Sequence, residues 1–164
     1  MKTILKKFPL GVAILFLLGG LNVRAQDKAD QLAVIVGKTS SLEAVTTAEL
    51  QKYFKAEKSK APDGTKIVIV MQDVGRPERD AALRDIYKMG EAEYGDYFVG
   101  QTFTGAVKSA PRSFASPAAV KQYVAETPGA IGYVRASDAD DTVKVLKVDG
   151  MAPGDPGYPV TGEP

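Results

Sequence analysis

Cysteine, histidine and tryptophan are all absent from this chain of 164 residues. Without cysteine there can be no disulfide framework, no thiol nucleophile and no thiol for lipid attachment. Without histidine, His-based catalytic triads are excluded, and the two absences together exclude ordinary zinc sites. Enzymes built on carboxylates or lysine remain open, but no nucleophile and base occur together in a recognisable motif. We therefore predict a protein that is not an enzyme and that uses no cofactor or metal.

The first 25 residues have the composition of a secretory signal peptide. Lysines at positions 2, 6 and 7 precede an apolar run over residues 10–21, and Val23-Arg24-Ala25 is a small-x-small tripeptide suited to signal peptidase. The run is too short to span a membrane. We expect cleavage after Ala25, a periplasmic mature protein and no membrane insertion after cleavage; the alternative is a retained amphipathic or membrane anchor.

Removal of residues 1–25 changes the sign of the net charge. Four of the 21 basic residues lie in that segment, which leaves 17 basic against 20 acidic side chains. A weakly acidic chain is a poor partner for nucleic acid. The remaining length suits one compact domain that buries roughly two-thirds of its unfolded surface. We assign this domain to residues 26–149.

Apolar runs and apolar periodicity predict an α/β fold. Short runs bounded by turn residues predict strands over residues 31–36, 66–71, 130–134 and 143–148, the last at a sheet edge. Helices are predicted after Thr46 or Thr47, from Pro77 to near Gly90, over residues 91–98 and after Ser116. Residues 103–114 show no clear period and are expected to form a loop or an irregular strand. Strands that alternate with helices indicate three layers around a mostly parallel central sheet.

Three polar or irregular segments have simple interpretations. Four lysines between residues 55 and 66 favour a solvated loop, with an acidic partner or an anionic surface as the alternative. Asp138, Asp140 and Asp141 resemble a calcium loop, but the glycine and final glutamate of an EF-hand are missing, which favours a solvated turn. Residues 150–164 are rich in proline and glycine, so a flexible tail is expected.

Residues 127–134 read Thr-Pro-Gly-Ala-Ile-Gly-Tyr-Val. Pro128 ends the preceding helix and Gly129 can take a positive φ, so a sharp turn leads into a buried strand. Gly132 inside that strand indicates close approach of another group. We interpret the apolar residues as core, with the alternative that Gly132 or Tyr133 lines a pocket. The segment resembles the Pro-Gly-Ala-Ile-Gly-Tyr segment of the phosphate-binding proteins of bacterial phosphate ABC transporters and of the short proteins related to them.

The resemblance spans about residues 31–148 and implies a single lobe of a type II periplasmic binding fold. In full-length members of that family, phosphate is held between two lobes. In those proteins, the turn that follows the strand corresponding to residues 66–71 carries the sequence Arg-x-Asp-x-Ser-Gly-Thr. Its arginine, serine and threonine help to hold the anion. Here Asp73 matches the aspartate, Met71 stands at the arginine position, and Gly75-Arg76-Pro77 stands at the Ser-Gly-Thr positions.

The resemblance therefore predicts a solute-binding domain for phosphate or another small oxyanion, binding weakly or together with a partner. The predicted contacts are Asp73, Gly75, Arg76, Arg79 and Thr104. The alternative for the arginines is pairing with nearby carboxylates such as Glu78. For the whole chain, the alternative is a ligand-free accessory or interaction domain in the cell envelope. The partner implied by either function is an ABC transporter or an envelope sensor.

Overall fold

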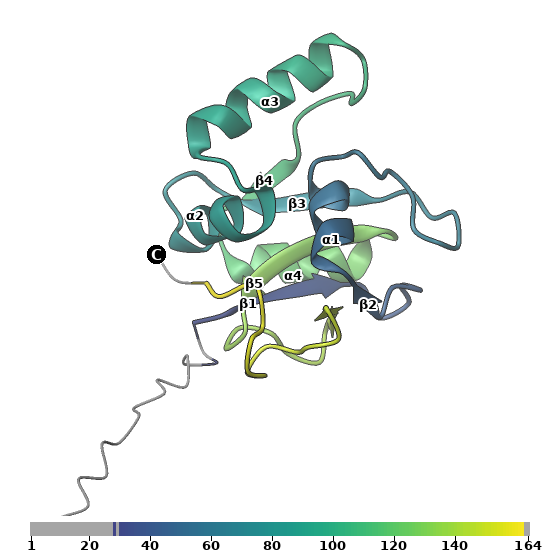
Figure 1. Cartoon of the computed structure of the whole chain (residues 1–164). Helices are drawn as coiled ribbons and strands as arrows, with labels where there is room; N and C mark the ends of the chain where they lie inside the picture. The colour runs from purple at the N-terminus through teal and green to yellow at the C-terminus, as the bar shows by residue number, and fades with distance from the viewer. Residues whose placement is uncertain (1–27, 29, 163–164) are drawn as a thin grey trace, which may run out of the picture.

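The computed structural model describes residue 28 and residues 30–162, and the predicted signal peptide lies outside them (Figure 1). The elements in chain order are β1 (Leu32–Val36), β2 (Ala44–Val45), α1 (Thr47–Phe54), β3 (Val68–Gln72), α2 (Pro77–Ala82), the π-helical segment η1 (Leu83–Tyr87), α3 (Glu91–Phe103), β4 (Arg112–Phe114), α4 (Pro117–Glu126), β5 (Ala130–Arg135), β6 (Lys144–Val145) and β7 (Lys147–Val148).

The central sheet has five strands in the order β4-β3-β5-β1-β6. β3 pairs in parallel with β4 and β5, whereas β1 pairs antiparallel with β5 and β6. All strands except β1 therefore point the same way, and the sheet is mixed but mostly parallel. A second sheet joins β2 and β7 in parallel. The predicted α/β class is confirmed.

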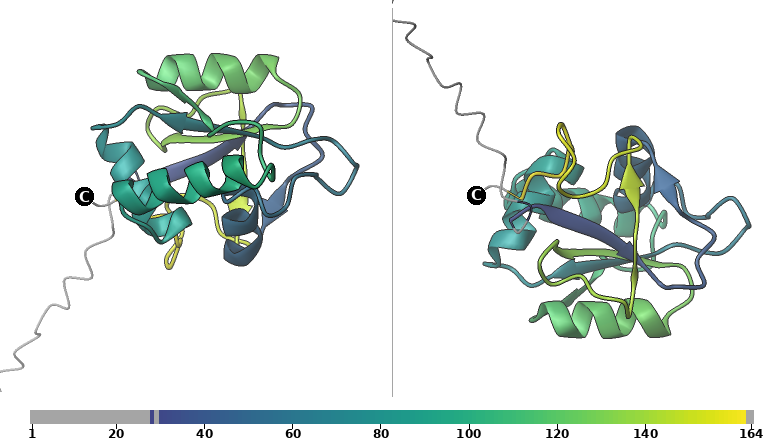
Figure 2. Two further views of the ribbon diagram at one scale, coloured as in Figure 1. Left: turned by 90° about the horizontal axis from the view of Figure 1, so that it is seen from above. Right: turned by 90° about the horizontal axis from the view of Figure 1, so that it is seen from below.

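Helices cover both faces of the sheet, which gives the three predicted layers. Figure 2 shows α4 on one side of the strands and the helices α1, α2 and α3 on the other. The side chains of β1 alternate accordingly: Leu32, Val34 and Val36 join the larger core, and Ala33 and Ile35 join the smaller core under α4. A strand buried on both faces reads as a continuous apolar run, as observed in the sequence.

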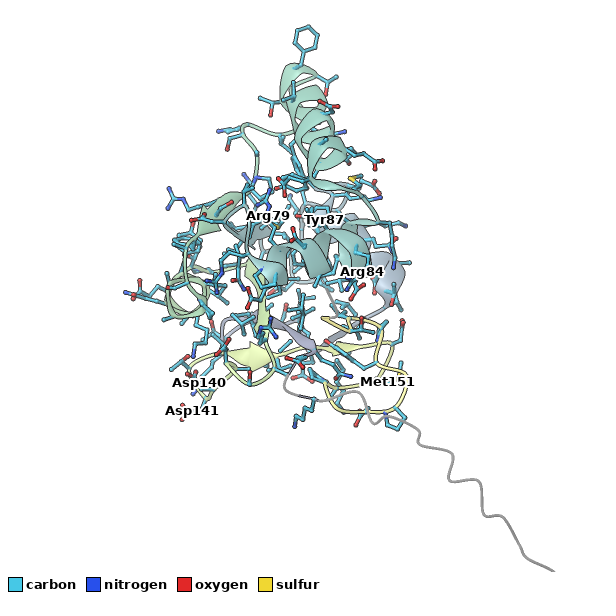
Figure 3. All side chains as sticks on the ribbon, turned by 90° about the vertical axis from the view of Figure 1, so that its left-hand side faces the viewer. Arg79, Arg84, Tyr87, Asp140, Asp141 and Met151 are labelled. Atoms are coloured by element: carbon cyan, nitrogen blue, oxygen red, sulfur yellow. The ribbon has the colours of Figure 1, made fainter. Side chains whose placement is uncertain are left out.

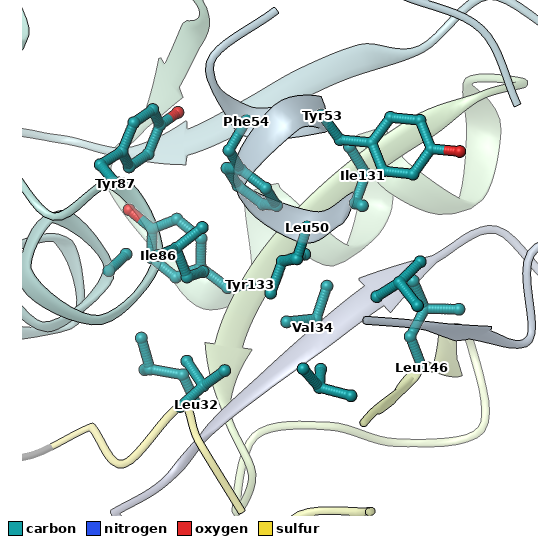
Figure 4. Packing of buried hydrophobic residues seen from close by; sticks show 14 of the residues in the cluster. Leu32, Val34, Leu50, Tyr53, Phe54, Ile86, Tyr87, Ile131, Tyr133 and Leu146 are labelled. Carbon is teal, nitrogen blue, oxygen red and sulfur yellow. The ribbon is translucent and has the colours of Figure 1, made fainter. Parts of the chain in front are cut away.

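Aromatic side chains fasten the helices of the larger core together (Figure 4). The ring of Tyr87 meets Phe54 edge-on at 5.6 Å and Tyr94 edge-on at 5.1 Å between centroids. These pairs add to the burial energy of each ring. The Tyr87 hydroxyl donates to the sulfur of Met71 at 3.2 Å. Tyr87 thus links η1 to α1, α3 and β3, and fixes the elements that follow β3.

The predicted helix starts are confirmed. Thr46 caps α1 by accepting from the Glu49 amide at 3.1 Å, and the Glu49 carboxylate accepts in return from the Thr46 amide. Ser116 caps α4 by accepting from the Ala119 amide at 3.2 Å. Each such cap stabilises a helix by about 1 kcal/mol.

The turn and strand over residues 127–134 form as expected. Gly129 has a φ of +77°, and a Cβ there would lie 2.0 Å from the carbonyl oxygen of Lys66. A Cβ at Gly132 would lie 3.2 Å from the Cβ of Val70, so this glycine allows β5 to lie close to β3. Tyr133 is fully buried, and its hydroxyl accepts from the Gln72 amide. The core interpretation of Gly132 and Tyr133 is confirmed.

Two element boundaries differ from the prediction. α3 extends to Phe103 rather than residue 98, because Gly100 interrupts the apolar pattern without breaking the helix. The last predicted strand is split into β6 at the sheet edge and β7 in the second sheet. The break falls at Leu146, which is buried and whose amide donates to the Val34 carbonyl.

Residues 150–162 pack on the domain, which differs from the flexible tail expected from their composition. Tyr158 and Val160 are each 2% exposed. The Tyr158 hydroxyl donates to the carbonyl of Leu32, and the Leu32 amide donates to the carbonyl of Val160. Asp85 accepts from both the amide and the hydroxyl of Thr161. Prolines and glycines form the turns of this segment, and two isolated apolar residues, Tyr158 and Val160, anchor it to the domain. The domain therefore continues past residue 149.

The lysine-rich and acidic segments make local contacts. Lys58 pairs with Glu49 at 3.0 Å and lies over the ring of Tyr53. Asp140, labelled in Figure 3, accepts from the amide of Thr142 and from the ammonium group of Lys121. Within residues 28 and 30–162, no helix has the length and apolar character needed to cross a membrane.

Candidate functional site

Residues 73–76 form the turn from β3 into α2, at the carboxyl end of β3. The Asp73 amide donates to the Phe114 carbonyl at 3.0 Å, and the Arg76 amide donates to the Asp73 carbonyl at 3.2 Å. Gly75 is exposed with a φ of +84°, and a Cβ there would meet nothing within 4 Å. The turn is therefore open to solvent at the point where the resemblance predicts an anion.

Arg76 lies beside this opening. Its Nε atom is buried and 3.4 Å from Oε2 of Glu78, an ion pair too long for a good hydrogen bond, and no acceptor in the described residues takes the Nε proton. Its side chain is 38% exposed. Pro77, at the first position of α2, supplies no amide donor. Arg76 is thus partly neutralised but still accessible.

Glu78 is the buried carboxylate of this region, with 5% of its side chain exposed. Its Oε1 accepts from Nε of Arg135 at 2.8 Å, and Arg135 also pairs with Asp30 at 2.7 Å. Burial acts to raise the pKa of Glu78, but the Arg135 hydrogen bond and the charges of Arg76 and Arg135 outweigh it and leave the pKa below its ordinary value. Glu78 is therefore ionised, and it pairs with Arg76 and Arg135, whose positive charges would otherwise be available to an anion.

Arg79 points inward, which differs from its predicted role as an anion contact (Figure 3). Its side chain is 4% exposed, and its Nε and Nη2 donate to the two carboxylate oxygens of Glu91, each at 2.7 Å. Nη1 donates to the carbonyl of Gln72 at 2.9 Å. The guanidinium also lies 4.8 Å from the ring centre of Tyr94. This arginine joins β3, α2 and α3 from within.

Thr104 lies at the opposite end of α3 from this group. It follows the last residue of the helix, and its hydroxyl donates to the Gln101 carbonyl at 3.1 Å. The first residue of α3 is Glu91, which pairs with Arg79. At 1.5 Å per residue the helix is roughly 20 Å long. The structure therefore does not bring Thr104 together with the 73–76 turn, although it does bring Asp73, Gly75 and Arg76 together.

Met71, at the family's arginine position, is buried in the core beneath Tyr87. The partners that occupy the arginines were only partly visible in the sequence. The sequence indicates Glu78, two residues from Arg76, as a partner. It does not indicate Glu91 or Arg135, because they lie 12 and 57 residues from the side chains that they bind.

Two hollows stand out in the described part of the chain, and neither is lined by residues 73–76. A small polar one of about 120 Å³ lies where β1 ends and β3 and β5 begin; its wall includes residues 39–41 and 125–129. Its charged side chains are Asp63 and Glu126, which repel anions. The second, about 540 Å³ and open, follows the apolar side of α3. Within the same residues, no group of three or more acidic side chains is placed to hold a metal ion.

No protein-family model matches the chain, and no curated protein matches its sequence. Solved structures do match its fold. An ABC-type phosphate transport receptor from Vibrio cholerae aligns with a TM-score of 0.61 at 16% identity, over 75% of this chain and 48% of that one. A putative phosphate ABC transporter substrate-binding protein with bound phosphate from Clostridium perfringens gives 0.59 at 22% identity, over 75% and 46%. PstS from Borrelia burgdorferi gives 0.57 at 17% identity, over 75% and 49%.

These similarities cover three quarters of this chain, but the aligned part is less than half the length of the proteins that it matches. The first of these is named as a transport receptor and the second as a putative substrate-binding protein. At this level of identity the comparison shows the fold, which agrees with the resemblance carried by residues 127–134. The chain has the fold of part of a phosphate ABC transporter substrate-binding protein.

Proposed function

We propose that the chain is a periplasmic solute-binding domain without enzymatic activity, which binds phosphate or a similar small oxyanion weakly at the 73–76 turn. The donors are the Gly75 amide and the Arg76 guanidinium. The accessible Arg76 side chain next to an open Gly75 is the observation that carries this proposal. The shared fold with phosphate ABC transporter substrate-binding proteins supports it.

The contacts available limit the expected affinity. A charge-assisted hydrogen bond contributes about 1.5–3 kcal/mol, so two donors supply about 3–6 kcal/mol. A millimolar dissociation constant corresponds to about 4 kcal/mol and a micromolar one to about 8 kcal/mol. Arg79 is committed to Glu91, and Glu78 already takes charge from Arg76. We therefore expect millimolar binding by the chain alone, and tighter binding only when a partner supplies donors from the other side.

The test is an NMR titration of the chain with phosphate and with sulfate. The Gly75 amide should shift with a millimolar dissociation constant, and Arg76→Gln should abolish the shift. Arg84→Gln is the matched control, because Arg84 is similarly exposed, at 42%, and also pairs with a carboxylate of its own helical segment. Equal responses in both variants, or no shift with either anion, would exclude the 73–76 turn as the site.

A second function is favoured by Met71 and Arg79. One position that binds the anion in the resembling family is buried here, and the buried Arg79 has a structural role. Such a lobe can act as a ligand-free accessory domain for an ABC transporter or an envelope sensor. Capture from periplasm of a specific transporter or sensor subunit, undiminished by Arg76→Gln, would support this function. Anion binding without a stable partner would contradict it.

A further inference from the structure

One side of α3 is apolar and uncovered within the described part of the chain. Val99 is 69% exposed and Phe103 is 92% exposed. Together with Gly95 they recur every four residues, so they lie one above another along the helix. Figures 1 and 3 show α3 standing away from the sheet. We refer to Gly95, Val99 and Phe103 as the α3 patch.

The α3 patch has both a projection and a recess. The open hollow of about 540 Å³ runs along it, with Tyr94 and Phe98 contributing the buried side. Gly95 adds no side chain, and a Cβ there would meet nothing within 4 Å. Val99 and Phe103 also line the hollow, and Phe103 is 92% exposed. Val99 lies midway between Gly95 and Phe103 along the helix.

We propose that the α3 patch is a self-association surface, on which a second copy of this chain packs with its α3 antiparallel about a two-fold axis at Val99. A two-fold interface uses the same surface on both copies, so the surface must be complementary to itself. The equal spacing of Gly95 and Phe103 from Val99 meets this condition. Phe103 of each copy then fills the hollow beside Gly95 of the other.

Charge along the helix favours this orientation and this occupant. Asp96, exposed and next to Gly95, lies in the first half of α3, whereas Lys108 follows its carboxyl end. Neither residue forms an ion pair within residues 28 and 30–162. A parallel pair of helices would bring acid against acid. The antiparallel pair places the acidic end of one helix beside Lys108 of the other.

The inference goes beyond the proposed anion site, because the α3 patch shares no residue with the 73–76 turn. Loss of anion binding in Arg76→Gln and loss of self-association are therefore separate results. Dimerisation is expected in the absence of phosphate.

Cysteine cross-linking tests the position of the axis, since the chain has no cysteine of its own. Val99→Cys should form a disulfide-linked dimer under mild oxidation about tenfold faster than Val74→Cys, a control of matched type that is 70% exposed on the 73–76 turn. Equal rates for the two variants would overturn the two-fold arrangement. So would a wild-type chain that remains monomeric in sedimentation equilibrium at its highest soluble concentration.

A second pair of variants tests the recess. Gly95→Gln should weaken dimerisation about tenfold or more by filling the hollow that receives Phe103, while circular dichroism and Tm show a retained fold. Ala118→Gln, at an exposed helical position of α4 across the sheet, should leave dimerisation unchanged. Identical dimerisation of Gly95→Gln and the wild type would overturn the proposal. A monomeric chain that binds phosphatidylcholine vesicles through Phe103 would overturn it in favour of a lipid surface.

Discussion

Arg79 and Glu91 form a two-pronged ion pair, with both hydrogen bonds at 2.7 Å, which fastens the first residue of α3 to the first turn of α2. The same guanidinium reaches back to the carbonyl of Gln72 at the end of β3. An arginine three residues beyond the open Arg76 thus holds the domain together instead of facing a ligand. Mutation of the two arginines should therefore affect stability to very different extents.

Arg79→Ala should lower the free energy of unfolding by about 2–3 kcal/mol. Removal of one partner from a buried ion pair costs about 3–5 kcal/mol, and the loss is smaller here because water can reach Glu91, which is 41% exposed. Urea unfolding measures the change. Arg76→Ala, at a more exposed arginine of the same segment, should cost less than about 1 kcal/mol. Equal losses in the two variants would contradict the structural role of Arg79.

Stability should fall in acid because Glu91 is stabilised as a carboxylate. The hydrogen bond from Arg79 lowers the pKa of Glu91 below its ordinary value. A carboxyl group whose pKa is lowered by folding stabilises the protein above its unfolded pKa of about 4.3, and this stabilisation is lost as the pH falls through the folded pKa.

Urea midpoints of the wild type and Glu91→Gln, compared between pH 7 and pH 3, test this linkage. The difference in urea midpoint between the two proteins should shrink as the pH falls. Glu93→Gln, on the same helix but without an ion pair in the described residues, should follow the wild type throughout. A gap that stays constant with pH would show that Glu91 acts through packing alone.

The sequence predicts those parts of the fold that depend on local chemistry. The caps at Thr46 and Ser116, the turn at Gly129 and the buried β5 all follow from neighbours along the chain. The antiparallel direction of β1 does not, since a continuous apolar run indicates burial on both faces without giving direction.

The candidate site is harder to predict, because part of it depends on residues that lie far apart in the sequence. The turn brings Asp73, Gly75 and Arg76 together because they are adjacent, and that much is visible in the sequence. Whether an arginine is free depends on partners from distant elements. Arg79 is bound by Glu91 of α3, and Arg135 of β5 competes for the same carboxylate as Arg76.

Gly129→Ala should destabilise the domain by more than about 2 kcal/mol. The residue has a φ of +77°, where a side chain costs about 1–2 kcal/mol, and its Cβ would lie 2.0 Å from the Lys66 carbonyl oxygen. Gly100→Ala is the control, since a Cβ there meets nothing within 4 Å of an exposed helix, and it should stabilise by about 0.5–1 kcal/mol. Thermal unfolding measures the Tm of both variants. A change of Tm in the same direction in both would show that the turn relaxes to accept the side chain.

Tyr158→Ala should cost about 3 kcal/mol if residues 150–162 belong to the folded domain. The ring is 2% exposed and its hydroxyl donates to the Leu32 carbonyl at the start of β1, so truncation leaves both a cavity and an unpaired acceptor. Tyr158→Phe keeps the ring and removes one hydrogen bond, and should cost only about 1 kcal/mol. Urea unfolding ranks the three proteins. The proline and glycine content of residues 150–162 suggests a mobile tail, and such a tail would give all three proteins the same urea midpoint. A side chain that is not packed against the domain contributes nothing to the stability of the domain.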